Sequence, residues 1–162
     1  MRSVADFYQD CMACADALPP LDVKLADAVS CVLAEDVQAP FNLPVVDLAA
    51  CDGYAVRIRD CEGASLEKPV TLPVTEEIRA GAVDPAALVP GTAIRIASGA
   101  PLPTGAEAVV SLEFTDHGVA QVALRTSPAG GENIRRRAED VAQGDTVLRS
   151  GTRIGARQMA LL

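Results

Sequence analysis

Apolar and polar side chains alternate in the stretch Thr92-Ala93-Ile94-Arg95-Ile96, and again in Val110-Ser111-Leu112-Glu113-Phe114. A period of two is typical of a β-strand. Asp116-His117-Gly118 has the composition of a hairpin turn and leads into a third alternating stretch, residues 119–125. Eleven prolines and twelve glycines are spread through the 162 residues. The sequence therefore predicts a mainly β protein with a few short helices.

The N-terminal residues predict a helix over 3–18. Ser3 can cap it, with Asp6 three positions later, and Pro19-Pro20 ends it. Its apolar stripe includes Cys11 and Cys14, which we expect in a core rather than at a zinc or thioredoxin-like site. Beyond the prolines, residues 21–25 and 35–39 read as short strands.

The C-terminal residues predict a hairpin in which 146–148 and 152–154 flank the turn Ser150-Gly151, followed by the start of an apolar helix over 158–162. We expect three parts in the chain: an N-terminal helix over 1–19, a smaller linking or dimerisation unit made of 20–39 plus 145–162, and a β-rich domain over 40–144 inserted into it.

The composition excludes several kinds of partner. A net charge of −8 argues against nucleic acid or an anionic membrane. No apolar run approaches the length of a membrane span. Five scattered cysteines suit reduced thiols better than a disulfide framework, so we expect a cytoplasmic protein.

Three motifs carry chemical groups. In the first, Asp47 and Asp52 flank four residues, and Gly53 follows. A carboxylate presented at such a loop suits a metal or a reacting group, whereas an ordinary Asp-Gly turn would use it to accept a backbone hydrogen bond. In the second, Ser98-Gly99-Ala100-Pro101 leaves a predicted strand. Its hydroxyl and N–H groups could hold an oxyanion, or it could be a plain strand exit.

The third motif, Arg135-Arg136-Arg137, is the sharpest because the chain is otherwise acidic. In an extended strand Arg135 and Arg137 point to one side and Arg136 to the other. Such a pair of guanidinium groups suits phosphate. Glu132, Glu139 and Asp140 lie nearby in sequence, so a solvated strand with surface ion pairs is the alternative.

In this order the three motifs resemble the N-terminal region of the MoeA family of molybdopterin molybdenumtransferases, which includes the C-terminal part of gephyrin. The resemblance extends over essentially the whole chain and is most specific in residues 133–140. It implies insertion of molybdate into adenylated molybdopterin in a Mg²⁺-dependent reaction, with no metal ligand identified. By resemblance, Asp52 and Asp140 are catalytic, and Ser98, Arg135 and Arg137 bind substrate or anion.

The sequence also departs from the family. Cys51 stands where Met is usual, Leu48-Ala49 where an Asn-Ser pair is usual, and Ser98 where Thr is usual. The family's chains continue into an α/β domain, which completes the cleft from the other subunit of a homodimer. On this resemblance we expect the chain to carry half of a cleft and to be inactive by itself, with its first helix packing on the missing domain.

Two other functions stay open at this point. A dimerising or binding module of the same fold would act without catalysis. A hydrolase would pair Asp47 with Asp52, separated by about 5–9 Å across a sugar-sized cleft. An aromatic content of only 3% leaves few platforms on which a sugar could stack, so the hydrolase ranks last.

Overall fold

The computed structural model describes residues 2–16 and 18–162 and divides them into two compact units. One unit comprises the residues up to Val37 together with Thr146–Leu162, and the other comprises Gln38–Asp145. The element order is dominated by short strands with few helices, which confirms the predicted mainly β class.

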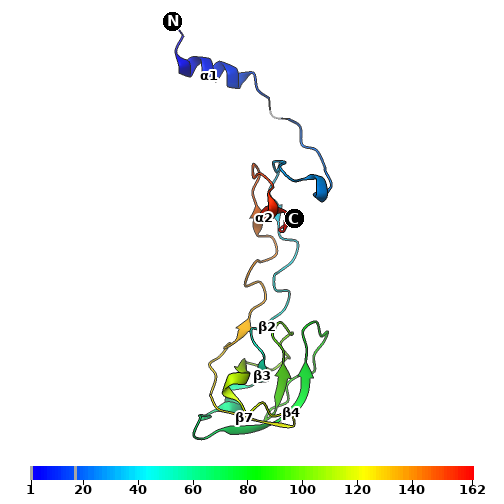
Figure 1. Ribbon diagram of the computed structural model, residues 1–162, viewed down its shortest axis with the longest axis vertical. Coiled ribbons are helices and arrows are strands. Elements are labelled where there is room, and N and C mark those ends of the chain that lie inside the picture. Colours follow the sequence, from blue (N-terminus) through cyan, green and yellow to red (C-terminus); the bar gives the residue numbers. More distant parts are fainter. Residues whose placement is uncertain (1, 17) are drawn as a thin grey trace. The chain divides into compact units, whose positions relative to one another are not determined.

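The larger unit is built on a five-stranded sheet, visible in Figure 1 around the labels β3, β4 and β7. Its strands, in spatial order, are β6 (Ala108–Ser111), β3 (Gly53–Val56), β5 (Ala93–Ile96), β4 (Val70–Ile78) and β7 (Gln121–Leu124). The pair β4–β5 is parallel, and the other three pairs are antiparallel. Every residue of β3, an interior strand of this sheet, is buried, as expected for a strand covered on both faces.

Alternation along the strands sorts their side chains into two apolar clusters. Tyr54 and Val56 belong to one cluster, and Ala55 between them belongs to the other. The second cluster also contains Ala49 of β2 (Leu48–Ala49), and Ile134 of β8 (Ile134–Arg135) packs against it. Strands β2 and β8 pair antiparallel, so the short sheet that carries two of the sequence motifs rests on this cluster.

The described residues also form three short 3₁₀ helices: η1 (Leu25–Asp27), η2 (Ile58–Cys61) and η3 (Leu112–Phe114). The predicted strand over 110–114 is therefore wrong in its second half, where the chain leaves β6 and turns into η3. A bridge between Thr115 and Leu124 closes the expected turn, but β7 pairs along its length with β4.

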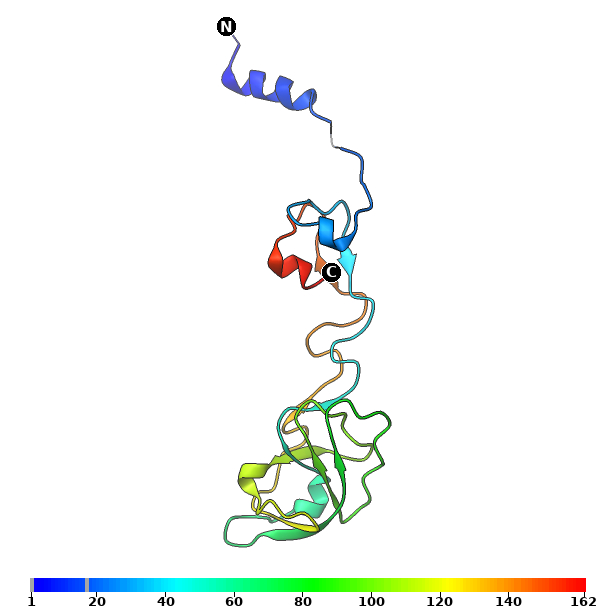
Figure 2. The same cartoon turned by 45° about the vertical axis from the view of Figure 1, so that its right-hand side comes forward.

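The smaller unit contains α1 (Val4–Ala13), α2 (Ala156–Met159) and the irregular segments between Leu25 and Val37. Backbone hydrogen bonds join Ser30, Cys31 and Leu33 to residues 151–154, and α2 follows them in both views (Figure 2). Strands β1 (Val37–Gln38) and β9 (Thr146–Leu148) form a two-stranded sheet.

The structure overturns three predictions about the smaller unit. The final hairpin is wrong, because β9 pairs with β1 while Arg153 bridges Val32. Residues 21–25 form no strand within the described chain, and only η1 begins there. The first helix carries the predicted capping box on Ser3 but ends at Ala13.

The expectation that Cys11 and Cys14 lie in a core is wrong, because both are exposed: α1 buries none of its residues, and Cys14 directly follows it. All five cysteines are free thiols in the structure.

Candidate functional site

Asp52 lies at the start of β3, where the chain leaves the short sheet and enters the large one. Its Oδ1 accepts a hydrogen bond of 2.7 Å from the backbone N–H of Ser98, and its own carbonyl accepts one from Leu112. Its second carboxylate oxygen, Oδ2, has no hydrogen-bond donor in the described part of the chain. The side chain therefore combines the turn-bracing role of an Asp-Gly turn with one oxygen available to a ligand.

A small open cavity of about 150 Å³ adjoins Asp52. It is lined by Asp52, Gly53, Glu77, Arg95, Ile96, Ala97 and Leu112. Glu77 and Arg95 face each other in the parallel pair β4–β5, and our sequence analysis did not identify either of them as a site residue. They come together only through a parallel pairing, for which the local sequence carries no signal.

Gly53 is required beside Asp52 for a steric reason. A Cβ at this position would lie 2.1 Å from the carbonyl oxygen of Val110 on the neighbouring strand β6. Close approach of two backbones is a common reason for glycine inside a strand. The Asp52 carboxylate is thus presented by a strand that packs unusually close to its neighbour.

Ser98 has both of its donors in use. Its N–H binds Asp52, and its hydroxyl donates a long hydrogen bond of 3.3 Å to the carbonyl of Ala50. The next two N–H groups, those of Gly99 and Ala100, bind backbone carbonyls. An anion at this strand exit would have to displace the weak Ser98–Ala50 bond, and an anion-binding role for Ser98 stays a prediction.

Arg135 and Asp140 form an ion pair of 2.5 Å between Nη2 and Oδ2. Both side chains are about half exposed. They share an open cavity of about 340 Å³ with the apolar residues Leu43, Pro44, Val45 and Leu48. The register places Arg135 opposite Leu48 in the β2–β8 pair. A guanidinium–carboxylate pair beside an apolar wall suits a ligand with both an apolar surface and an anionic group.

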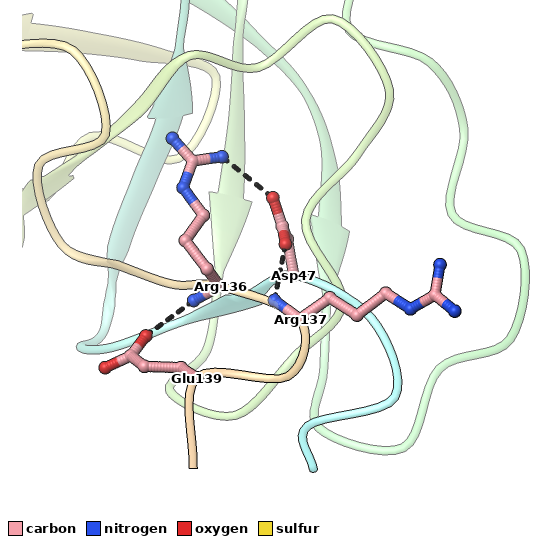
Figure 3. Close-up of polar contacts among 4 residues, drawn as sticks. All are labelled: Asp47, Arg136, Arg137 and Glu139. Atoms are coloured by element: carbon pink, nitrogen blue, oxygen red, sulfur yellow. Dashed lines mark hydrogen bonds and ion pairs between the residues drawn. The ribbon is translucent and has the colours of Figure 1, made fainter. Parts of the chain in front are cut away.

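Asp47 makes the strongest set of contacts near the arginine run. Its Oδ2 accepts from Arg136 Nη1 at 2.8 Å, and its Oδ1 accepts from the backbone N–H of Arg137 at 2.7 Å (Figure 3). The pKa of Asp47 is lowered, chiefly by the hydrogen bond from Arg137, against an opposing contribution from burial and with help from Arg136. Sequence reasoning weighed Asp47 only as a partner of Asp52.

The predicted strand over 135–137 is wrong beyond its first residue. Strand β8 ends at Arg135, and the run lies between two non-glycine residues with left-handed backbones, Asn133 (φ 55°) and Ala138 (φ 63°). Arg136 and Arg137 therefore do not follow strand alternation. Arg137 extends away from Asp47 (Figure 3), and within residues 2–16 and 18–162 its guanidinium makes no ion pair.

The hydrolase interpretation gains nothing from these contacts. Asp47 and Asp52 bind different partners, and of these two residues only Asp52 lines either of the cavities described above.

In the described residues no three acidic, histidine or cysteine side chains are placed to hold a metal ion together. Nor does any described helix have the length and apolar character that crossing a bilayer requires.

Comparison with known proteins gives a consistent result. The family described as "MoeA N-terminal region (domain I and II)" matches residues 2–162. Molybdopterin molybdenumtransferase 2 of Mycobacterium tuberculosis is 50% identical over 151 residues, which cover 93% of this chain and 37% of the relative. Molybdopterin molybdenumtransferase of Bacillus subtilis is 40% identical over 144 residues, 86% of this chain and 34% of the relative.

The fold is also found in a solved structure. The crystal structure of the molybdopterin biosynthesis moeA protein from Pyrococcus horikoshii OT3 superposes with a TM-score of 0.80 and 38% sequence identity. The match covers 86% of this chain and 37% of that one. The chain thus spans little more than a third of the length of the proteins it matches.

Proposed function

The chain belongs to the MoeA family, to whose N-terminal region residues 2–162 correspond, and on this premise we propose that it forms part of a molybdenum-inserting site. The substrates would be molybdate and adenylated molybdopterin. The single observation that carries the proposal is the cavity in which Arg135 and Asp140 lie beside an apolar wall.

The substrates match the two characters of this cavity. A pterin is a flat ring system that can lie on apolar side chains, and its phosphate is an anion. Arg135 keeps several of its five N–H donors available while one is engaged with Asp140. Arg137, whose guanidinium extends outward, would add a second anion contact (Figure 3). These two arginines would bind and orient the anionic groups.

Carboxylates repel anions, so Asp52 and Asp140 need a different role. When the two molybdopterin sulfurs bond to molybdenum, their protons are released, and an oxygen that leaves molybdate as water takes up two protons. Asp52 and Asp140 would carry protons between these groups as general acid–base residues. Ser98 would hydrogen-bond an oxo or phosphate oxygen.

Mg²⁺ is part of the proposal, and the donor set fits a weakly held ion. Asp52 and Glu77 line one cavity together with the cationic Arg95, and Mg²⁺ is commonly bound by one or two carboxylates plus substrate phosphates. Glu77 would be the main protein ligand, which leaves Asp52 Oδ2, an oxygen without a donor among the described residues, for proton transfer. The ion would supply neutralisation of the phosphate charge.

The wider organisation is proposed with it. We infer a cytoplasmic homodimer in which the helix over 1–19 packs on an α/β domain, residues 20–39 and 145–162 link or dimerise, and residues 40–144 carry half of the cleft. The net charge of −8 supports the absence of a nucleic-acid partner.

An insertion assay on the complete product of the gene tests the proposal. Purified protein is mixed with adenylated molybdopterin, molybdate and Mg²⁺, and the molybdenum cofactor formed is measured. We expect Asp52→Asn and Asp140→Asn to lose most of the activity. Full activity in both variants would refute the catalytic assignment. Wild-type binding of molybdopterin without any insertion would favour the non-catalytic binding module.

A further inference from the structure

The three consecutive arginines differ in their surroundings, and two of them form ion pairs. Arg135 pairs with Asp140 at 2.5 Å, and Arg136 pairs with Asp47 at 2.8 Å. Arg137 makes no ion pair with any described residue, and its guanidinium extends away from Asp47 (Figure 3). The run is thus divided into one arginine that lines the cavity, one that stabilises the loop, and one that is presented to solvent.

Two carboxylates hold the middle of the run. Asp47 binds the guanidinium of Arg136 and the backbone N–H of Arg137, while Glu139 Oε2 accepts the backbone N–H of Arg136 at 2.7 Å. The Arg136 guanidinium lies against Gly131, where an added Cβ would be 2.9 Å from its Nη2. Arg136 is therefore held by a charged partner, with its guanidinium beside Gly131.

The backbone on both sides of Arg137 is fixed independently. Arg135 is paired in β8, and the N–H of Ala138 donates to the carbonyl of Pro44 at 3.0 Å. Ala138 adopts φ 63°, a left-handed conformation that is strained for an alanine. Between these anchors, Asp47 Oδ1 accepts the N–H of Arg137. The direction of the Arg137 side chain thus depends on a carboxylate that lies 90 residues earlier in the chain.

We propose that Asp47 is a positioning residue for anion binding: it holds Arg136 out of the site and sets the direction in which the Arg137 guanidinium meets a tetrahedral dianion. This inference rests on the proposed function, which assigns the anion contact to Arg137. Asp47 itself touches no substrate. Its negative charge is taken up by two donors, so it does not oppose the anion that Arg137 binds.

A double-mutant cycle tests whether Asp47 acts through Arg137. The 162-residue chain is titrated with molybdate, and separately with inorganic phosphate, while the arginine Nε–Hε signals are followed by NMR. The variants are Asp47→Asn, Arg137→Gln and the combination of both. Asp116→Asn is the matched control, because Asp116, like Asp47, accepts two hydrogen bonds, but it lies in another loop.

We expect Arg137→Gln and Asp47→Asn each to raise the Kd for both anions roughly tenfold, the scale of one hydrogen bond to a charged group. In the double variant the Kd should be no higher than in Arg137→Gln alone, and Asp116→Asn should leave it unchanged. An independent structural role of Asp47 would instead multiply the two effects. The inference is overturned if the two changes in binding free energy add up in the double variant, or if Asp47→Asn leaves the Kd unchanged.

The outcomes separate this inference from the proposed function. If Arg137→Gln leaves the Kd unchanged, the anion-binding role of Arg137 fails and the inference fails with it. If Arg137→Gln weakens binding but Asp47→Asn does not, only the inference fails. Should Asp47→Asn not fold, Arg136→Gln breaks the same bridge from the other end. It should weaken binding in the same direction, and an unchanged Kd would again overturn the inference.

Discussion

Replacing Gly53 with alanine tests how the Asp52 carboxylate is presented. Gly53 follows Asp52 directly and begins strand β3, which pairs with β6. An added Cβ would lie 2.1 Å from the carbonyl oxygen of Val110, 2.9 Å from its carbonyl carbon and 3.0 Å from Val109 Cγ1. The two nearest atoms are backbone, so no side-chain rotation relieves the clash.

The size of the effect follows from this geometry. The Cβ falls about 1.3 Å short of the 3.4 Å at which ordinary contact begins, so β3 has to move away from β6. Overpacking of this kind costs about 1–3 kcal/mol, and two weakened ladder hydrogen bonds cost about 0.5–1.5 kcal/mol each. Alanine also lowers the conformational entropy of the unfolded chain, which offsets the loss by about 0.4–1 kcal/mol. We expect a net loss of roughly 3 kcal/mol in the free energy of unfolding.

Tyrosine fluorescence during urea unfolding measures this loss in the larger unit. The chain has two tyrosines and no tryptophan. In a Tyr8→Phe background the remaining tyrosine is Tyr54, which is fully buried next to Gly53. The matched control is Gly130→Ala, where the nearest atom to the added Cβ is Ile58 Cδ1 at 3.4 Å. We expect this control to change the free energy of unfolding by less than about 0.5 kcal/mol.

The result that would refute the reasoning is a loss below about 1 kcal/mol in Gly53→Ala with the unfolding slope unchanged. The close approach of β3 to β6 would then not be the reason for glycine at this position. If the loss is as large as expected, the proposed insertion activity should fall as well, because Asp52 directly precedes the displaced strand.

Three further predictions concern the same unit. Tyr54→Phe removes the hydrogen bond of 2.9 Å from Tyr54 Oη to the Gly118 carbonyl and should lower the free energy of unfolding by about 1 kcal/mol, read from urea unfolding by circular dichroism. Hydrogen bonds from backbone N–H groups, chiefly that of Ala123, lower the pKa of Asp116 from 3.8. This carboxylate should therefore stabilise the fold above pH 3.8, and the stability difference from Asp116→Asn should disappear as the pH falls through the lowered pKa. Burial raises the pKa of Cys61 to about 11, so Ellman's reagent at pH 8 should modify the three exposed cysteines quickly and Cys61 only after unfolding.

The sequence predicts where several strands lie, because alternation is a local signal. The stretch Thr92–Ile96 contains β5, and residues 119–125 contain β7. Which strands pair is a different question. The β4–β5 pair is parallel and brings Glu77 beside Arg95. No hairpin turn joins these two strands, so the local sequence does not indicate that they pair. Pro73 within β4 also makes this strand hard to recognise from the sequence, because proline is unusual inside a strand. The proline lies just before Val74, where the pairing with β5 begins.

The wrongly predicted final hairpin also shows that strand pairing cannot be read from local sequence. The turn around Gly151 is real, since the N–H of Thr152 bonds to the carbonyl of Arg149. The segments that flank the turn find their partners at Val37–Gln38 and at Val32 instead of each other. Turn chemistry sets the local reversal of the chain, but a strand pairs with whichever edge tertiary packing brings to it.

The site was predictable to a similar degree. The unusual composition of residues 135–137 and the carboxylate at Asp52 stand out in the sequence. The contact between Asp47 and this run could not be read from the sequence, because it joins residues 90 positions apart and depends on the left-handed turn at Ala138. Alternation would have placed Arg137 beside Arg135, whereas the strand ends at Arg135.

The proposed anion site lies in an acidic chain, and this leads to a last expectation. At physiological ionic strength charges are screened over about 8 Å, so the net charge of −8 matters less at the site than its nearest groups. There the charge of Asp47 is taken up by Arg136 and the Arg137 N–H, and that of Asp140 by Arg135. The Arg137 guanidinium alone in the run lacks an ion pair among the described residues, and we expect anion affinity to come from its directed hydrogen bonds. Arg137→Lys, which keeps the charge but not the fork, should therefore raise the Kd for molybdate nearly as much as Arg137→Gln. A Kd in Arg137→Lys equal to that of the wild type would show that charge alone accounts for the binding.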